Sequence, residues 1–162
     1  MLPDLATYSK AIANGYPLAA VAGSDRLREE TAGVYATGSF WYGAVPMAAA
    51  IATIATLRDE QGIATMQRMG TLLRDGLARQ AESHGLMIHQ TGPVQMPFLT
   101  FARDQAFERA NVFTGEAAQR GVYLHPWHDW FLSAAHTEDD IGQALERTDE
   151  AFAVVRRKFG AE

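Results

Sequence analysis

The chain has 162 residues, of which 48% are hydrophobic and 20% are charged, and its formal net charge is −5. This length and composition fit one globular domain with a hydrophobic core and argue against intrinsic disorder. A modest negative charge without clustered Lys and Arg gives no electrostatic basis for binding nucleic acid. The absence of cysteine excludes disulfides, thiolate metal sites and thiol nucleophiles, and it leads us to expect a cytoplasmic protein.

No segment predicts a membrane span or a secretory signal. The longest apolar run, residues 44–57, is rich in alanine, contains Thr53 and Thr56, and is followed by Arg58. It is too short and too weakly apolar to cross a bilayer. The first residues carry Pro3 and no basic region, unlike a signal peptide. We therefore expect no membrane partner.

The first part of the chain predicts a strand, a short helix and a loop. Residues 17–23 are small and apolar and lie between proline and glycine, which is typical of a short buried strand. Ser24 and Asp25 can cap a short helix over residues 26–31. Residues 34–44 combine aromatic and small side chains and are predicted to form a loop.

Two longer helices follow. Pro46 suits the first turn of a helix over residues 46–60, where its missing N–H costs nothing, and Gly85 suits the end of a second helix over residues 63–83. Apolar residues recur on one side of each predicted helix: Met47, Ile51 and Ile54 in the first, and Ile63, Met66, Leu73 and Leu77 in the second.

Short strands and one helix are predicted next. The strands cover residues 86–89 and 95–102, the helix covers 104–119, and two further short strands cover 122–124 and 131–134.

The last helix, residues 137–159, has the clearest pattern. Thr137 is a good N-cap. Core-facing positions recur three or four residues apart: Ile141, Leu145, Thr148, Phe152, Val155 and Phe159. The order of elements predicts an α/β or α+β domain with helices packed on a small, mainly antiparallel sheet.

Lys10 is the first candidate for chemistry. All basic residues of the chain are arginines except Lys10 and Lys158, and Lys158 lies in a charged C-terminal segment. Lys10 instead lies among small and apolar residues. A neutral lysine amine can attack a carbonyl and form a Schiff base, which the permanently protonated arginine cannot do. Spacing alone leaves open the alternative of a solvated surface lysine.

The loop that contains Thr37, Gly38 and Ser39 is the second candidate. Small hydroxyls beside a glycine let backbone N–H groups and an O–H approach a phosphate closely. An ordinary turn, in which the neighbouring aromatic side chains simply pack, is the alternative.

The third candidate is the stretch HPWHDW, residues 125–130. His125 and His128 raise the question of a metal, but a structural zinc site usually has four ligands, often with sulfur. We therefore predict no metal site and favour a substrate-pocket or interface loop, where aromatic side chains with polar tips are common. His136 is interpreted as a loop residue.

Three stretches together resemble class III pyridoxal-phosphate aminotransferases, the group that includes glutamate-1-semialdehyde aminomutase. They are PDLATYSKAIANGYPLAAVAGS, YATGSFWYGAVPMAAAIATIATL and GVYLHPWHDWFLSAAHTEDDIGQALERTDEAF. They are similar to the family's lysine segment, its next block and its C-terminal domain, in the family's order, and they span nearly the whole chain. The resemblance implies the C-terminal part of a fold-type I pyridoxal-phosphate-dependent transferase.

The resemblance also implies site residues. Lys10 falls on the lysine that forms a Schiff base with pyridoxal phosphate and then moves a proton between cofactor and substrate carbons. Ser39, after Gly38, falls where the family usually has a threonine whose hydroxyl reaches the cofactor phosphate of the neighbouring subunit. The chain departs from the family at residues 41–44, which replace a Gly-Asn-Pro turn. This departure leaves the phosphate-binding role of Ser39 open, with the hydroxyl of Thr37 as the alternative. It also leads us to expect a bulkier or aromatic amine substrate.

Residues 1–60 are accordingly expected to be the end of a large cofactor domain, and residues 61–162 a small domain. The predicted helices over residues 46–83 should carry apolar surface meant for partners outside this chain. We expect a fragment, inactive by itself, of a homodimeric enzyme that moves an amino group from a small-molecule donor to a keto or aldehyde acceptor, or within one molecule as an aminomutase does. A non-catalytic remnant or interaction module that keeps the fold is the alternative. A Schiff-base aldolase would need a barrel pattern, which the chain lacks.

Overall fold

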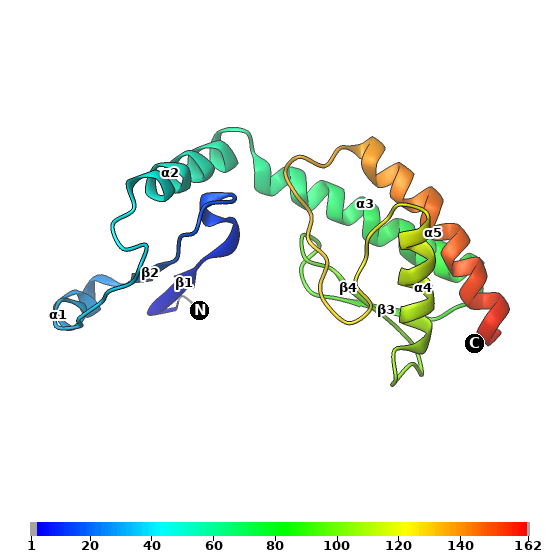
Figure 1. Ribbon diagram of the computed structural model, residues 1–162. Helices are drawn as coiled ribbons and strands as arrows, with labels where there is room; N and C mark the ends of the chain where they lie inside the picture. Colours follow the sequence, from blue (N-terminus) through cyan, green and yellow to red (C-terminus); the bar gives the residue numbers. More distant parts are fainter. Residues whose placement is uncertain (1–2, 162) are drawn as a thin grey trace. The chain divides into compact units, whose positions relative to one another are not determined.

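The computed structural model describes residues 3–161 of the chain. The chain divides into two compact units, Met1–Gln61 and Gly62–Glu162 (Figure 1). The assignment of these parts to a cofactor domain and a small domain stays a prediction.

The first unit begins with a β-hairpin that holds Lys10 in its connection. Strands β1 (Leu5–Tyr8) and β2 (Ala20–Gly23) pair antiparallel, from Leu5 opposite Gly23 to Tyr8 opposite Ala20. A 3₁₀ turn, η1 (Lys10–Ala13), follows β1 directly. The expected buried strand over residues 17–23 is wrong in two respects. Only Ala20–Gly23 is extended, and it is mostly exposed, because its partner β1 makes only a two-stranded ribbon.

The helices of the first unit follow the hairpin. A short η2 (Asp25–Leu27) leads into α1 (Arg28–Ala32), and a loop leads to α2 (Ala44–Asp59). The predicted helices over residues 26–31 and 46–60 are thus confirmed with small shifts at their ends. The turn η1 contacts α2.

The first unit has little core of its own. Its buried hydrophobic side chains, among the residues that the structure describes, are Ala13 and Ala50. Large apolar side chains of α2 face solvent instead: Val45, Met47, Ile51 and Ile54, with Ile51 71% exposed. The prediction that this helix carries uncovered apolar surface is therefore confirmed.

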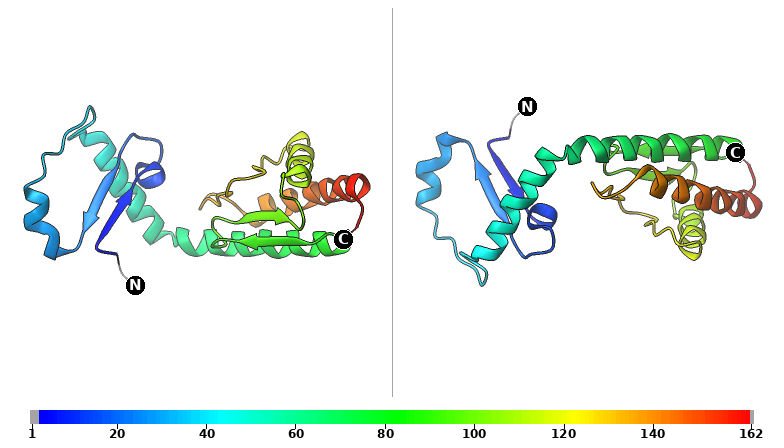
Figure 2. Two further views of the ribbon diagram at one scale, coloured as in Figure 1. Left: turned by 90° about the horizontal axis from the view of Figure 1, so that it is seen from below. Right: turned by 90° about the horizontal axis from the view of Figure 1, so that it is seen from above.

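The second unit combines three helices with a two-stranded antiparallel sheet. The helices are α3 (Gly62–Ser83), α4 (Glu108–Gln119) and α5 (Glu138–Phe159), and the strands are β3 (Ile88–Thr91) and β4 (Phe98–Phe101). Helix α5 packs against both α3 and α4, and the strands run along α3 (Figure 2). This arrangement confirms the expected fold of helices on a small antiparallel sheet.

Three phenylalanines from three elements meet in the core of the second unit. The ring centroids of Phe113 on α4 and Phe152 on α5 lie 4.5 Å apart, and Phe101 on β4 lies 5.7 Å and 5.9 Å from them. Phe113 and Phe152 are almost completely buried. The predicted stripe on α5 is confirmed, since Ile141, Thr148, Phe152 and Val155 are all buried and Leu145 and Phe159 pack against the core.

Two expectations about the second unit are wrong. Residues 122–124 and 131–134 are loop, not strand, because only two backbone bonds, Trp130 N–H to Pro97 O and Leu132 N–H to Gln95 O, tie this loop to the chain before β4. The helix expected from residue 104 begins at Glu108. Asp104 lies before the helix, and its carboxylate accepts hydrogen bonds from the Arg109 and Ala110 N–H groups in the first turn. No helix within the described residues is long and apolar enough to cross a membrane.

Candidate functional site

Lys10 occupies the first position of η1, at the point where the hairpin connection leaves β1. Its backbone φ is +53°, in the left-handed region that non-glycine residues rarely adopt. The turn ends on Asn14, which is also left-handed with φ +43° and ψ +57°, and Gly15 follows with φ +106°. Non-glycine residues held in this region cluster at functional sites.

Backbone hydrogen bonds stabilise this turn. The N–H groups of Ile12, Asn14 and Tyr16 donate to the carbonyls of residues 9, 11 and 13, at 3.1–3.2 Å. Ala13 is completely buried. The backbone around Lys10 is therefore anchored through strand pairing at one end and through burial of Ala13 at the other.

The Lys10 side chain itself is exposed, and its amine makes no hydrogen bond or ion pair with any residue that the structure describes. A fixed backbone and an exposed amine without a hydrogen-bond partner together suit a side chain that reacts with a molecule outside this chain.

Gly38 and Ser39 lie on the loop before α2. The Trp41 N–H donates to Gly38 O at 3.0 Å, which closes a turn around Ser39, and Gly43 caps α2 without a side-chain hydrogen bond. The hydroxyls of Thr37 and Ser39 are exposed and make no hydrogen bond within the described part of the chain. The structure brings Gly38 and Ser39 close to the start of α2 but joins neither to Lys10 by a hydrogen bond.

Aromatic side chains surround this loop. Phe40, Trp41 and Tyr42 are 70%, 53% and 77% exposed, and the rings of Trp41 and Tyr42 meet edge to face at 5.2 Å. The turn of the alternative interpretation is present, but its aromatic side chains remain more than half exposed in the described part of the chain.

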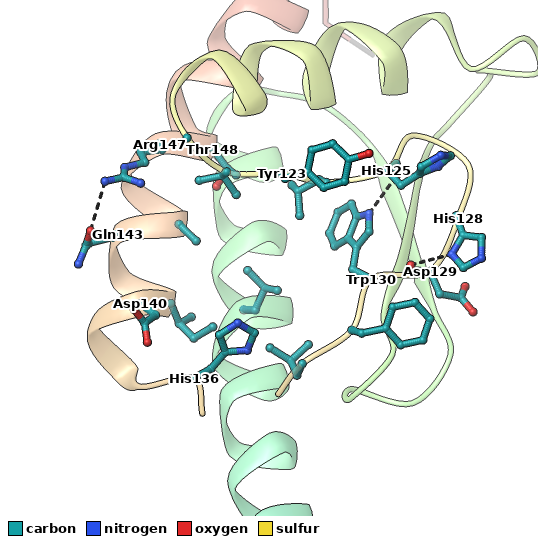
Figure 3. Close-up of a pocket in the computed structure, with 18 residues that line it drawn as sticks. Tyr123, His125, His128, Asp129, Trp130, His136, Asp140, Gln143, Arg147 and Thr148 are labelled. Atoms are coloured by element: carbon teal, nitrogen blue, oxygen red, sulfur yellow. Dashed lines mark hydrogen bonds between the residues drawn. The ribbon is translucent and has the colours of Figure 1, made fainter. Parts of the chain in front are cut away.

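A second candidate site lies in the second unit. A cavity of about 660 Å³ is bounded by α3, α5 and the loop between α4 and α5 (Figure 3). This volume is in the range of small-molecule pockets. Its lining includes apolar residues, among them Leu73, Leu132 and Ile141, and polar residues, among them His136, Asp140 and Arg147.

The loop with His125 and His128 forms one wall of this cavity, as the sequence suggested for a pocket loop. The Trp130 indole N–H donates to His125 O at 2.9 Å (Figure 3), and the Trp127 N–H donates to His125 Nδ1 at 3.3 Å. A neutral His125 therefore carries its proton on Nε2. Among the described residues, no group of three or more His, Cys, Asp or Glu side chains is placed to hold a metal.

Among the residues that line this cavity, Asp140 and Arg147 were not considered as candidates, and His136 was interpreted as a loop residue. The Ser133 N–H donates to His136 Nδ1 at 3.0 Å, which orients that ring. Thr137 donates its N–H and its hydroxyl to the Asp140 carboxylate, and these bonds, with the nearby His136, hold the pKa of Asp140 below its ordinary value. Helical spacing was the available signal for Asp140 and Arg147. Each lies next to a buried position of α5, Ile141 or Thr148, and so lies at the edge of the packed face of that helix.

Comparisons with known proteins agree with the sequence resemblance. The family model described as "Aminotransferase class-III" matches residues 1–151. An aminopentol aminotransferase from Sphingopyxis macrogoltabida is 46% identical over 98% of this chain, and a 3-aminobutyryl-CoA aminotransferase from Cloacimonas acidaminovorans is 28% identical over 96%. The chain spans 38% of the length of each of these relatives.

Solved structures agree in fold. The FumI protein of Sphingopyxis sp. MTA144, in its PLP internal aldimine form, superposes with a TM-score of 0.93 and 46% identity, over 97% of this chain and 38% of that one. An omega-transaminase from Sphaerobacter thermophilus superposes with a TM-score of 0.84 at 20% identity, over 95% of this chain and 39% of that one, which supports the fold alone. Because the family model covers most of the chain, the chain belongs to the class III aminotransferase family.

Proposed function

We propose that this chain is the C-terminal portion of a pyridoxal-phosphate-dependent aminotransferase and that Lys10 carries the cofactor. Class III aminotransferases use pyridoxal phosphate, and one similar structure is described as a PLP internal aldimine form. The observation that carries the proposal is the state of Lys10: its backbone is held left-handed while its amine is exposed and uncommitted.

The residues present fit such a cofactor. A primary amine is the group that condenses with an aldehyde, and the free hydroxyls of Ser39 and Thr37 are groups that donate to phosphate oxygens. Gly38 would leave the backbone open to close approach, since a Cβ at this position meets nothing within 4 Å. When bound, pyridoxal phosphate supplies the carbonyl that exchanges the amino group and the conjugated ring that withdraws electrons from the substrate carbon.

Each residue then has a defined task. Lys10 would hold the cofactor through Nζ, and the same Nζ, when free, would accept a proton from a substrate carbon and return it at a neighbouring carbon. Ser39 donates its hydroxyl proton to a phosphate oxygen. In the homodimer that we propose for the complete enzyme, this oxygen belongs to the cofactor of the neighbouring subunit.

The reaction that we propose is amino transfer from a small-molecule amine to a keto or aldehyde acceptor. Both named relatives are called aminotransferases, which favours transfer between molecules over an internal aminomutase rearrangement. A bulky or aromatic amine is favoured by the exposed side chains of Phe40, Trp41 and Tyr42.

The alternative function is a non-catalytic interaction module. It is favoured by the uncovered apolar face of α2, because exposed apolar patches mark sites of protein association. This alternative predicts no specific reaction at Lys10.

The test uses the complete reading frame that encodes this chain. We expect the purified protein to bind pyridoxal phosphate in equal amount and sodium borohydride to fix it at Lys10, as located by mass spectrometry. Lys10→Arg should abolish both fixation and amine-dependent transfer, whereas Lys158→Arg, at the other lysine of this 162-residue sequence, should change neither. The chain of 162 residues by itself should be inactive.

Two results would overturn the proposal. One is a complete frame that neither binds the cofactor nor transfers amino groups, which favours the interaction module. The other is fixation at Lys158 as readily as at Lys10, which denotes unspecific reaction of exposed amines.

A further inference from the structure

The segment from Lys10 to Gly15 contains three residues with positive φ: Lys10, Asn14 and Gly15. Glycine adopts such angles at little cost, and asparagine tolerates them better than most other residues. Lysine has no such tolerance. The left-handed state of Lys10 must therefore be imposed by the rest of the turn.

Asn14 is the other non-glycine residue of this turn with a positive φ. Asn14 ends η1 in the left-handed conformation, and its N–H donates to Ala11 O at 3.1 Å. The chain can then return through Gly15 and Tyr16 toward β2, which pairs with β1 beside Lys10. If residue 14 adopted a right-handed angle, η1 would continue as helix and the connection could not close in this form.

No contact of the Asn14 side chain explains why asparagine occurs at this position. It is exposed, and within the part of the chain that the structure describes it makes no hydrogen bond. Its contribution within this chain is therefore its backbone angle.

We propose that Asn14 is a positioning residue for the cofactor lysine: its left-handed backbone closes the hairpin connection and thereby fixes the direction in which the Lys10 side chain leaves the chain. This inference rests on the proposed role of Lys10. The direction of the Cα–Cβ bond follows from the backbone angles on either side of it. A relaxed turn would therefore aim Nζ away from the position that holds the cofactor.

The test compares three replacements of Asn14 in the complete reading frame, with the rate of pyridoxal phosphate release and its dissociation constant as readouts. Asn14→Gly, which adopts φ +43° freely, should release the cofactor as the parent does. Asn14→Asp, which also tolerates this angle, should stay within a factor of about two to three of the parent. Asn14→Ala should bind the cofactor about tenfold more weakly, because alanine resists the left-handed region.

The pattern across the variants decides the proposal. Equal cofactor affinity in all three variants would overturn it, since the backbone angle would then not matter. Equal loss in Asn14→Gly and Asn14→Ala would also overturn it, because it would indicate a side-chain contact. If Asn14→Ala does not fold, Asn14→Gly and Asn14→Asp still decide, because a tenfold loss in either contradicts a backbone role.

Borohydride fixation separates this inference from the proposed function. Fixation at Lys10 in the parent together with indifference to residue 14 removes the positioning role and leaves the function intact. No fixation at Lys10 in the parent removes both.

Discussion

Two glycines of α3 lie where another part of the second unit approaches closely. A Cβ at Gly70 would collide with the backbone carbonyl of Val94, and one at Gly76 would collide with the side chain of Leu145. We expect Gly70→Ala to lower the free energy of unfolding by about 3 kcal/mol, because main chain has to move, and Gly76→Ala by about 1–2 kcal/mol, because Leu145 can change rotamer. Denaturant unfolding of the chain measures both.

Gly115 on α4 and Gly142 on α5 are the matched controls. A Cβ at either position meets nothing within 4 Å. Replacement by alanine should therefore stabilise the chain by about 0.5–1 kcal/mol, the usual gain of alanine over glycine inside a helix. Equal destabilisation by all four replacements would contradict the close approaches at Gly70 and Gly76.

The residue type and neighbours of Lys10 made it a candidate, and the family resemblance gave it a predicted role, but the sequence could not reveal the left-handed backbone there. That angle belongs to the turn that Asn14 closes between β1 and β2, and the pairing of these strands joins residues that are distant in sequence. Likewise Ser39 was proposed only from the resemblance and stays a prediction, whereas Asp140 and Arg147 were not considered because their position beside a cavity depends on how α5 packs.

Helix α5 begins with a reciprocal pair of hydrogen bonds. The Asp140 N–H donates to Thr137 Oγ1 at 3.2 Å, and the Thr137 N–H donates to Asp140 Oδ2 at 2.8 Å. Removing the cap with Thr137→Ala should cost about 1 kcal/mol of unfolding free energy. Thermal unfolding measures this, and an unchanged midpoint would contradict a stabilising cap.

The same cap predicts a dependence on pH. Hydrogen bonds from Thr137 lower the pKa of Asp140 in the folded chain, so the stability they confer is complete above the pKa of an unfolded aspartate. It is lost as the pH falls below about 4, through the lower pKa of the folded state. Asp140→Asn should remove this part of the acid sensitivity, so the parent and variant unfolding curves should converge at low pH.

Among the elements, the long helices were predicted with accurate bounds, whereas the strands predicted over residues 86–89 and 95–102 only overlap β3 and β4, and β1 was not predicted. Residues 46–60, 63–83 and 137–159 show helical spacing over several turns, and α2, α3 and α5 begin and end within two residues of those bounds. The strand β1 has only four residues and no distinctive pattern. Its extended state depends on pairing with β2, which local sequence does not encode.

The two units differ in how far their own residues stabilise them. Sixteen buried residues form the main core, and all of them, from Met69 to Val155, belong to the second unit. The first unit buries two alanines among its described hydrophobic residues. Area buried from water is the main source of folding free energy, so we expect the units to differ in stability.

Amide hydrogen exchange on the chain tests this difference. Residues 62–162 should show protected amides in α3, α4 and α5 and should remain folded when expressed separately. Residues 1–61 should exchange rapidly in the absence of a partner. Equal protection in both parts would contradict the prediction, since it would require stabilising contacts that the first unit does not have.

The lysine-bearing turn η1, in which Ala13 is buried, contacts α2, the helix with the uncovered apolar face. Folding of the turn η1 therefore favours folding of α2, and the reverse also holds. By thermodynamic linkage, any molecule that occupies Lys10 stabilises α2 by an amount that grows with its concentration above its dissociation constant. Reciprocally, a protein that binds the apolar face of α2 raises the affinity for a molecule bound at Lys10, by the same coupling free energy.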